Sequence, residues 1–238
     1  MKRVSTPPVM TQAFDAAHAE AYDRNLEHIQ AITGTLHLLM RWQFSKLPED
    51  AQVLVVGAGT AAEARFLAPI FPRWRFTLVD PSAAMLEVGR RHAVAEGFAD
   101  RCTLHVGHLS SLAAGPFDAA TSVLVSHFLT DAADRRAYFG EIARRLKPGG
   151  LLFNADLCAE LDHPAFASVM DLWLDLADMP EERKESFRAA FGRGVAAHGP
   201  AEVDAMIAGA GFSAPVLCVQ AALIRGWTAV RRSQPAGH

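Results

Sequence analysis

The stretch VLVVGAGTAA, residues 53–62, holds residue types that could bind a nucleotide. An apolar run ends at Gly57 and Gly59, and a helical pattern follows directly. Glycines at such a turn tolerate positive φ angles and let backbone amides approach a phosphate, a sugar or an amino-acid group closely. Alone, this loop is weak support for a ligand, because a tight strand-to-helix turn without a ligand uses the same residues.

Asp80 strengthens the ligand hypothesis. It ends the apolar run FTLVD, where a carboxylate can accept two hydrogen bonds from the hydroxyls of a ribose. Loop and acid together favour an adenosine-type ligand. The loop carries Glu63 and no lysine, so a ligand with a sugar and a zwitterionic amino-acid tail suits it as well as a pyrophosphate does.

Two further residues could take part in catalysis. His127, in VLVSHFLTD, is the best candidate for a general base, because an imidazole can take a phenol or amine proton near neutral pH. Asp156 follows the fifth predicted strand, and open α/β sheets bind ligands at the carboxyl ends of their strands. Both are predicted catalytic residues, with packing as the alternative for His127 and a helix cap or surface place for Asp156.

The elements that position these residues alternate between strand and helix. Helical patterns begin near Ala61, Ser82 and Ala132. Between them, short apolar strands are predicted at residues 52–56, 75–79, 102–106, 118–125 and 151–155. This alternation predicts a parallel sheet with helices on both faces.

Helical patterns at residues 13–23 and 26–47 precede this core, and residues 158–198 read as a helical lid. After one more helix at Pro200–Gly209, two β-like runs are joined tightly around Gln220 and Ala221. A connection that short predicts an antiparallel pair near one edge of the sheet. The expected fold is an α/β, Rossmann-like three-layer sandwich with a mostly parallel seven-stranded sheet and an antiparallel C-terminal strand.

The chain divides into four expected parts. They are an N-terminal arm and helical cap (1–50), a cofactor-binding core (51–157), a helical lid (158–199), and a closing segment with the last helix and a β-hairpin (200–238).

Composition limits the class of protein. Half of the 238 residues are apolar, the formal charge is −3, and the arginines form no dense block, which argues against a nucleic-acid or anionic-membrane partner. No apolar run approaches the roughly 18 residues of a membrane span. The three cysteines form no metal-binding spacing, and no metal site is expected. We expect a cytoplasmic protein with a small-molecule substrate, either as a monomer or as a homodimer.

From about Phe14 to Arg231 the chain resembles the class I S-adenosylmethionine-dependent methyltransferases. The resemblance rests on the order and spacing of the motifs VLVVGAGTAAEARFLA, FTLVDPSAAMLEVGRR, LHVGHLSSL, GPFDAATSVLVSHFLTD and RRLKPGGLLFNADL. It implies S-adenosyl-L-methionine as the cofactor and methyl transfer as the reaction.

The resemblance also implies roles for single residues. Gly57, Ala58 and Gly59 would line the methionine part of the cofactor, and Asp80 would hold the ribose hydroxyls. The other implied contacts are Pro81 and Met85 near the adenine, His108 and Leu109 at the adenine edge, Val123 near the sulfonium, and Tyr22 on a covering helix.

Three positions depart from the pattern that this family often shows. Val55 stands where an acid is common, Ala61 where a third glycine is common, and His108 where an aspartate is common. Each departure removes a feature that relatives use to anchor the cofactor.

An apolar stripe in the lid bears on the substrate. Most stripes of this helical spacing are core packing, but side chains that face the cleft would select a small apolar or aromatic molecule. The candidates are Phe166, Met170, Trp173, Leu174 and Phe187 in the lid, together with Trp42 or Trp227.

Other functions stay open at this stage. The N-terminal helices, the helical insert and the closing AGF…ALIRGWTAV also resemble the carboxy-S-adenosylmethionine synthase group, which needs a cation such as Arg188, Arg193 or Arg225 for an extra carboxylate. A nicotinamide-dependent oxidoreductase needs a Tyr/Lys-type pair, and neither Tyr22 nor Tyr138 has a suitably spaced lysine. A non-enzymatic protein that kept the fold is the third alternative.

Overall fold

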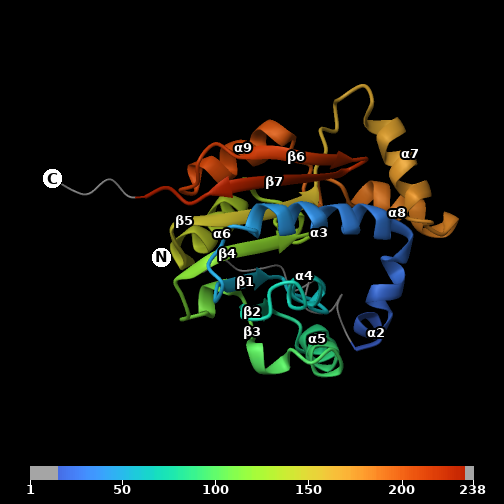
Figure 1. Ribbon diagram of the computed structural model, residues 1–238. Coiled ribbons are helices and arrows are strands. Elements are labelled where there is room, and N and C mark those ends of the chain that lie inside the picture. Colours follow the sequence, from blue (N-terminus) through green and yellow to red (C-terminus); the bar gives the residue numbers. More distant parts are fainter. Residues whose placement is uncertain (1–15, 234–238) are drawn as a thin grey trace.

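A seven-stranded sheet forms the centre of the computed structural model, which describes residues 16–233 (Figure 1). Its strands are β1 Gln52–Val56, β2 Arg75–Asp80, β3 Cys102–Val106, β4 Phe117–Val123, β5 Leu146–Leu157, β6 Val216–Ala221 and β7 Ile224–Val230. They lie in the order β3-β2-β1-β4-β5-β7-β6. β1 to β5 run parallel, and β7 runs antiparallel to both of its neighbours. The predicted Rossmann-like sheet with an antiparallel C-terminal strand is confirmed.

Helices cover both faces of this sheet. They are α2 Ala16–Asn25, α3 Gln30–Phe44, α4 Ala62–Leu67, α5 Ala83–Ala95, α6 Ala132–Arg145, α7 Phe166–Leu176, α8 Glu181–Ala190 and α9 Pro200–Gly209, with short 3-10 helices η1 Glu27–Ile29, η2 Ala99–Arg101, η3 Leu109–Ser111 and η4 Ser126–Phe128. Along β1, Val53 and Val55 enter the core beneath α3, α4 and α5, whereas Leu54 and Val56 enter the core beneath α6 and α9. Burial on both faces explains why β1 reads as an unbroken apolar run.

Side-chain caps place two helices at the carboxyl ends of the strands. Ser82 accepts a hydrogen bond from the backbone amide of Met85 (3.2 Å) and starts α5 directly after Asp80. Asp131 accepts from the amides of the first turn of α6, just after η4. Such caps satisfy amides that a helix leaves free at its start. They fix the chain shortly after Asp80 and shortly after His127.

The lid segment differs from the continuous helical pattern that the sequence predicts. It contains α7 and α8, which stand beside the start of α3 in Figure 1, while residues 158–165 and 191–199 are not helical. His163 is exposed, and its Nδ1 accepts the amide of Ala165 (3.1 Å) before α7 begins. This local turn precedes the first lid helix and leaves the His163 side chain at the surface.

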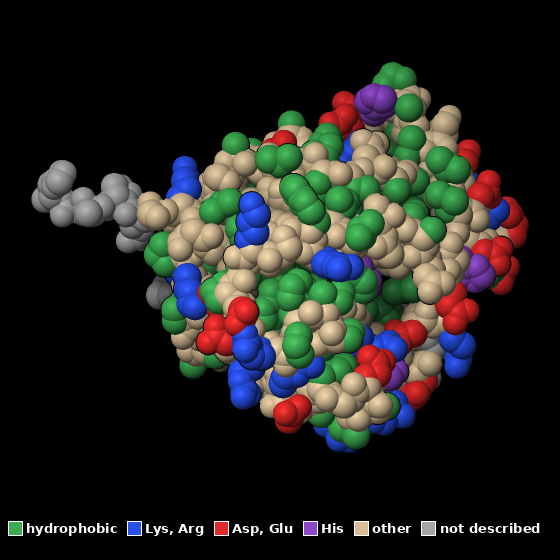
Figure 2. Space-filling view, viewed as in Figure 1, with side chains coloured by type: hydrophobic (Ala, Val, Ile, Leu, Met, Phe, Trp, Pro, Cys, Tyr) green, Lys and Arg blue, Asp and Glu red, His purple; other side chains and the backbone are tan. Residues whose placement is uncertain are grey.

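The lid helices expose charged residues, which on α8 are of both signs, and turn apolar residues toward the core. Figure 2 shows acidic side chains gathered over α7 and α8 at the right edge of the molecule. On the inner side, Met170, Trp173 and Leu174 are buried, and Phe166 and Phe187 are partly buried against the same core. Most of the apolar stripe is therefore core packing.

Several predicted boundaries are wrong by a few residues. β5 runs over Leu146–Leu157, where the sequence predicts a strand at residues 151–155. The tight turn between β6 and β7 lies at Ala222 and Leu223, since Gln220 and Ala221 still pair with β7. β4 ends at Val123, because Leu124 has a φ of +58° and leaves the strand. The pattern at residues 26–47 divides into η1 and α3. Residues 1–15 of the expected arm and residues 234–238 lie outside the described chain.

Candidate functional site

The glycine loop folds back over the end of β2. Gly57 and Gly59 have φ angles of +66° and +51°, and the amides of Gly57 and Ala58 both donate to the Val79 carbonyl (2.8 and 3.0 Å). A Cβ atom at Gly57 would lie 2.3 Å from Cγ2 of Val125. This clash and the positive φ angle together explain why position 57 is a glycine.

Two of the departures from the family pattern keep the local geometry. Ala61 has a φ of +66°, the left-handed conformation for which glycine is best suited, at a cost of about 1 kcal/mol. Val55 is 1% exposed and belongs to the core beneath α3. The turn therefore forms without the third glycine, and position 55 supplies packing where an acid is common in relatives.

Asp80 ties the loop to the start of α5. One carboxylate oxygen accepts the Gly59 amide (2.9 Å) and the other accepts the Ser82 amide (2.8 Å). Burial raises the pKa of Asp80, and the two amide hydrogen bonds work against that rise. Each oxygen keeps acceptor capacity, so the predicted contact with ribose hydroxyls is compatible with this arrangement.

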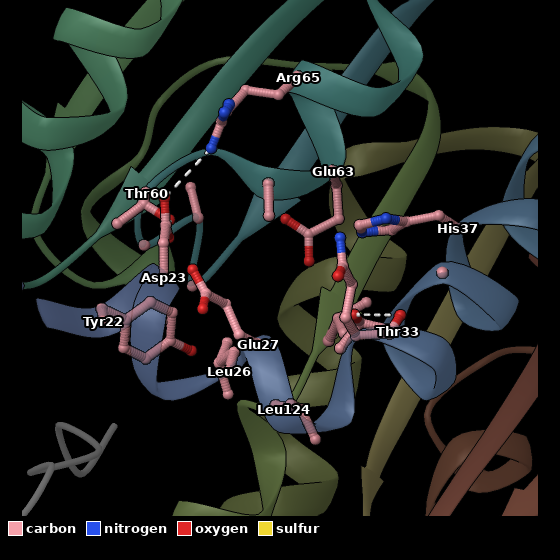
Figure 3. Close-up of a pocket in the computed structure, with 17 residues that line it drawn as sticks. Tyr22, Asp23, Leu26, Glu27, Thr33, His37, Thr60, Glu63, Arg65 and Leu124 are labelled. Carbon is pink, nitrogen blue, oxygen red and sulfur yellow. Dashed lines mark hydrogen bonds and ion pairs between the residues drawn. The ribbon is translucent and has the colours of Figure 1, made fainter.

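A cleft of about 410 Å³ separates the loop and α4 from α2, η1 and α3 (Figure 3). Tyr22, Gly57, Ala58, Gly59 and Val123 line it. At one rim Arg65 pairs with Asp23 (3.2 Å) and with Glu96 (2.8 Å). The floor is polar because α4 contributes Glu63, whose pKa burial raises to about 7.

A second cavity, of about 210 Å³, adjoins this cleft. Gly57, Gly59, Tyr22 and Val123 line both spaces, and the second wall also contains Asp80, Pro81, Met85, His127, Phe128 and Trp173. Most of the predicted cofactor residues therefore meet around one continuous region. His108 and Leu109 line a separate cavity of about 110 Å³, which Gly57 and Pro81 also border.

His127 and Asp156 form a buried pair. Each is a candidate from the sequence alone, but their contact with each other is not predicted. Nδ1 of His127 lies 2.7 Å from Oδ1 of Asp156, and the two side chains are 5% and 0% exposed. η4 brings His127 to the carboxyl end of β5, where Asp156 stands. Because Nδ1 faces the carboxylate, the imidazole presents Nε2 on its other side.

Further buried donors surround Asp156. Arg135 of α6 lies 3.3 Å from Oδ2 and donates through Nε to the Ser126 hydroxyl (2.9 Å), which itself donates to Oδ2. Burial opposes ionisation, but the hydrogen bond from His127 and the charge of Arg135 hold the pKa of Asp156 below its usual value. Asp156 is thus a buried anion held by internal partners.

This arrangement corrects the prediction for Asp156. The carboxylate has no exposed surface and lines neither cavity beside the glycine loop, so it is placed to orient His127 and not to contact a substrate. Sequence reasoning missed Arg135 and Ser126. The available signals were the Arg135/Arg136 doublet and the serine beside His127.

The three tryptophan candidates lie in three different environments. Trp173 lines the second cavity, whereas Trp42 is 75% exposed on α3 and Trp227 is 1% exposed in the core beneath α6 and α9. The expectation that Trp42 or Trp227 faces the cleft is wrong. Arg188, Arg193 and Arg225 also lie away from the two cavities at the glycine loop.

Known structures share this fold. The human N-acetylserotonin methyltransferase, solved in complex with S-adenosylmethionine, has a TM-score of 0.69 at 13% identity, over 96% of this chain and 60% of that one. An O-methyltransferase family protein from Burkholderia thailandensis has a TM-score of 0.67 at 16% identity, over 94% and 62%. At these identities the likeness establishes the fold.

Sequence likeness adds the family. Residues 53–150 match the model of a methyltransferase domain. Over this range the chain is similar to methyltransferase domains. It is 33% identical over 121 residues to the ubiquinone biosynthesis O-methyltransferase of Methylocella silvestris, which is 51% of this chain and 45% of that protein. The chain thus spans less than half of this relative.

Two further findings concern metal binding and membrane crossing. Among residues 16–233, no group of three or more His, Cys, Asp or Glu side chains is arranged to hold a metal ion. In the same part of the chain, every helix is too short or too polar for a membrane crossing.

Proposed function

We propose that the chain is an S-adenosylmethionine-dependent O-methyltransferase that acts on a hydroxyl group of a small, largely apolar molecule. The observation that carries this proposal is the position of His127. Oriented by Asp156, it lines the same 210 Å³ cavity as Gly57, Asp80 and Met85. A general base is useful only where the acceptor atom starts protonated, as a hydroxyl does.

The residues present fit the cofactor. Gly57 and Gly59 present bare backbone to the cleft, and Ala58 between them adds only a methyl group. Asp80 keeps acceptor capacity for the ribose, and Pro81 and Met85 supply apolar surface for the adenine. When bound, S-adenosyl-L-methionine supplies an electrophilic methyl group on a sulfonium. Tyr22, on α2, covers the loop from the other side.

The chain's own residues would accept the proton, orient the base and exclude water. Asp156 fixes the Nδ1 side of His127 and stabilises the imidazolium, so that Nε2 accepts the proton of the acceptor hydroxyl. Arg135 and Ser126 keep Asp156 ionised and in place. Phe128, Leu157 and Trp173 give the cavity an apolar wall, which excludes water and favours an apolar or aromatic substrate.

Relatives support the oxygen acceptor as part of this proposal. The Methylocella silvestris relative and the Burkholderia thailandensis structure are both named O-methyltransferases. The carboxy-S-adenosylmethionine alternative has less support, since Arg188, Arg193 and Arg225 lie outside both cavities. We propose that residues 51–157 bind the cofactor and that the lid, 158–199, selects the acceptor.

The test combines binding with turnover. Calorimetry with S-adenosylmethionine and S-adenosylhomocysteine measures the cofactor step, and mass spectrometry of reactions with a panel of phenols and small alcohols measures methyl transfer. We expect both cofactors to bind and one phenol class to gain a methyl group. Failure of both cofactors to bind at millimolar concentration would refute the proposal, whereas binding without any turnover would favour the non-enzymatic alternative.

A further inference from the structure

Glu63 is a buried carboxylate that points into the large cleft. It lies in the first turn of α4 and is 7% exposed. Figure 3 shows its carboxylate projecting from α4 toward the space above η1 and α3, with His37 and Glu27 on the facing side. A buried ionised group is costly unless a partner compensates it.

The described residues supply no cation to Glu63. The one arginine in the cleft wall, Arg65, pairs with Asp23 and Glu96 instead. The pKa of Glu63 rises to about 7 through burial and through the charge of Asp80, and only the backbone amide of Glu63 itself opposes that rise. Glu63 therefore lies among other acids, and the arginine of this cleft is already paired elsewhere.

The other buried carboxylates of residues 16–233 are compensated within the protein. Asp156 has Arg135 and His127, and Asp118 has Lys147 (2.7 Å). Asp80 accepts two backbone amides from other residues. Glu63 alone among these four has neither a cation nor a donor from another residue.

We infer that Glu63 binds the cationic ammonium group of the cofactor's amino-acid tail and so completes its own electrostatic pairing only when ligand is present. This inference deepens the proposed function and rests on it. The glycine backbone lies in the same cleft, which is large enough for an amino-acid tail. A primary ammonium presents three donors and one positive charge, which matches a buried carboxylate that lacks both.

The first test compares two ligands that differ in this tail. S-adenosylhomocysteine carries the ammonium, and 5′-methylthioadenosine lacks the whole amino-acid part. By calorimetry at pH 7.5, we expect Glu63→Gln to weaken S-adenosylhomocysteine binding by about 10- to 100-fold, the size of a charge-assisted hydrogen bond. Binding of 5′-methylthioadenosine should stay within about twofold.

A matched variant shows whether the position of the Glu63 carboxylate matters or only the total charge of the cleft. Glu27→Gln removes an exposed carboxylate from the same cleft wall, and we expect it to change S-adenosylhomocysteine affinity by less than about threefold. An equal loss in both variants, or an equal loss of both ligands in Glu63→Gln, would overturn the assignment. If the unsubstituted protein binds neither ligand, the proposed function itself fails, and that outcome is distinct.

A second test needs no variant. The groups around Glu63 are Tyr22 and Asp23 from α2, Glu27 from η1, His37 from α3, Asp80 from β2 and Arg65 from α4. If the ammonium pairs with Glu63, binding at pH 7 should release about half a proton, measured by calorimetry in buffers of different ionisation enthalpy. Binding without proton release would contradict the inference even if Glu63→Gln does not fold.

Discussion

Two buried carboxylates of this chain, Asp156 and Glu63, show opposite behaviour in similar burial. Asp156 is 0% exposed and Glu63 is 7% exposed, yet the pKa of Asp156 is lowered and that of Glu63 is raised to about 7. Arg135, His127 and Ser126 contact the first, while the second has the charge of Asp80 nearby and no cation paired with it. Burial alone therefore does not determine the charge of an acid, because its partners decide the sign of the shift.

The difference separates two kinds of functional residue. Asp156 is complete without ligand, which suits a group that orients the general base His127. Glu63 lacks a cationic partner and faces an open cleft, which suits a group that pairs with a cation only when a ligand binds. Substitutions at these acids and their neighbours test this difference.

The largest expected effect follows removal of the internally paired acid. Asp156→Ala leaves the Arg135 guanidinium buried without its anion, and we expect the free energy of unfolding to fall by about 3–5 kcal/mol in urea titrations. Replacing both partners, as in Asp156→Asn with Arg135→Met, should recover part of this loss. A loss below about 1 kcal/mol for Asp156→Ala would show that the pair is not buried as described.

The next effect concerns the residue that Asp156 orients. His127→Gln should lower kcat by about 10²- to 10⁴-fold, the usual contribution of a general base, since glutamine cannot accept the proton. Affinity for S-adenosylhomocysteine, measured by calorimetry, should stay within about threefold. A variant that keeps full turnover would remove His127 from the proposed chemistry.

The third effect has the opposite sign and depends on pH. The folded-state pKa of Glu63 lies above its ordinary value of 4.5, so the folded protein favours the protonated form. The resulting stability is present below pH 4.5 and is lost as the pH rises through about 7. We therefore expect Glu63→Gln to stabilise the ligand-free protein by up to roughly 3 kcal/mol at pH 8 and to change little at pH 4.5.

Denaturant midpoints measured at both pH values test the third effect. Equal midpoints for Glu63→Gln and the unsubstituted protein at pH 8 would mean that the carboxylate finds a partner or solvent in the folded state.

The smallest change in stability is expected at an exposed ion pair. Asp171 and Arg188 form an exposed ion pair between α7 and α8, at 62% and 39% exposure. Exposed pairs add little to stability because water and salt screen them. Asp171→Asn should leave the urea midpoint unchanged within error, and a shift as large as that of Asp156→Ala would mean that burial is not what distinguishes these acids.

Sequence reasoning reached the fold and part of the site for identifiable reasons. Alternating apolar strands and helices predict the sheet, and the glycine loop with Asp80 predicts the edge at which we propose that the ligand binds, because both signals are local. His127 and Asp156 could be nominated from their places after strands. Their contact with each other could not, since it depends on how η4 meets β5 in three dimensions.

The burial of Glu63 does not follow from its place in the sequence. A glutamate in the first turn of a helix is ordinary on a surface, and its burial arises only when α2 and α3 cover α4. Trp42 and Trp227 failed as cleft residues for the same reason, because helical spacing and strand alternation do not reveal which neighbour covers a side chain.

The most direct measurement is the titration of the Glu63 carboxyl carbon by NMR, with and without S-adenosylhomocysteine, using Glu63→Gln to assign the signal. We expect a pKa of about 7 in the free protein and a fall to well below that value in the complex, because a bound ammonium stabilises the carboxylate. A carboxyl group that titrates near 4.5 in the free protein, or one whose pKa does not move on binding, would contradict the account.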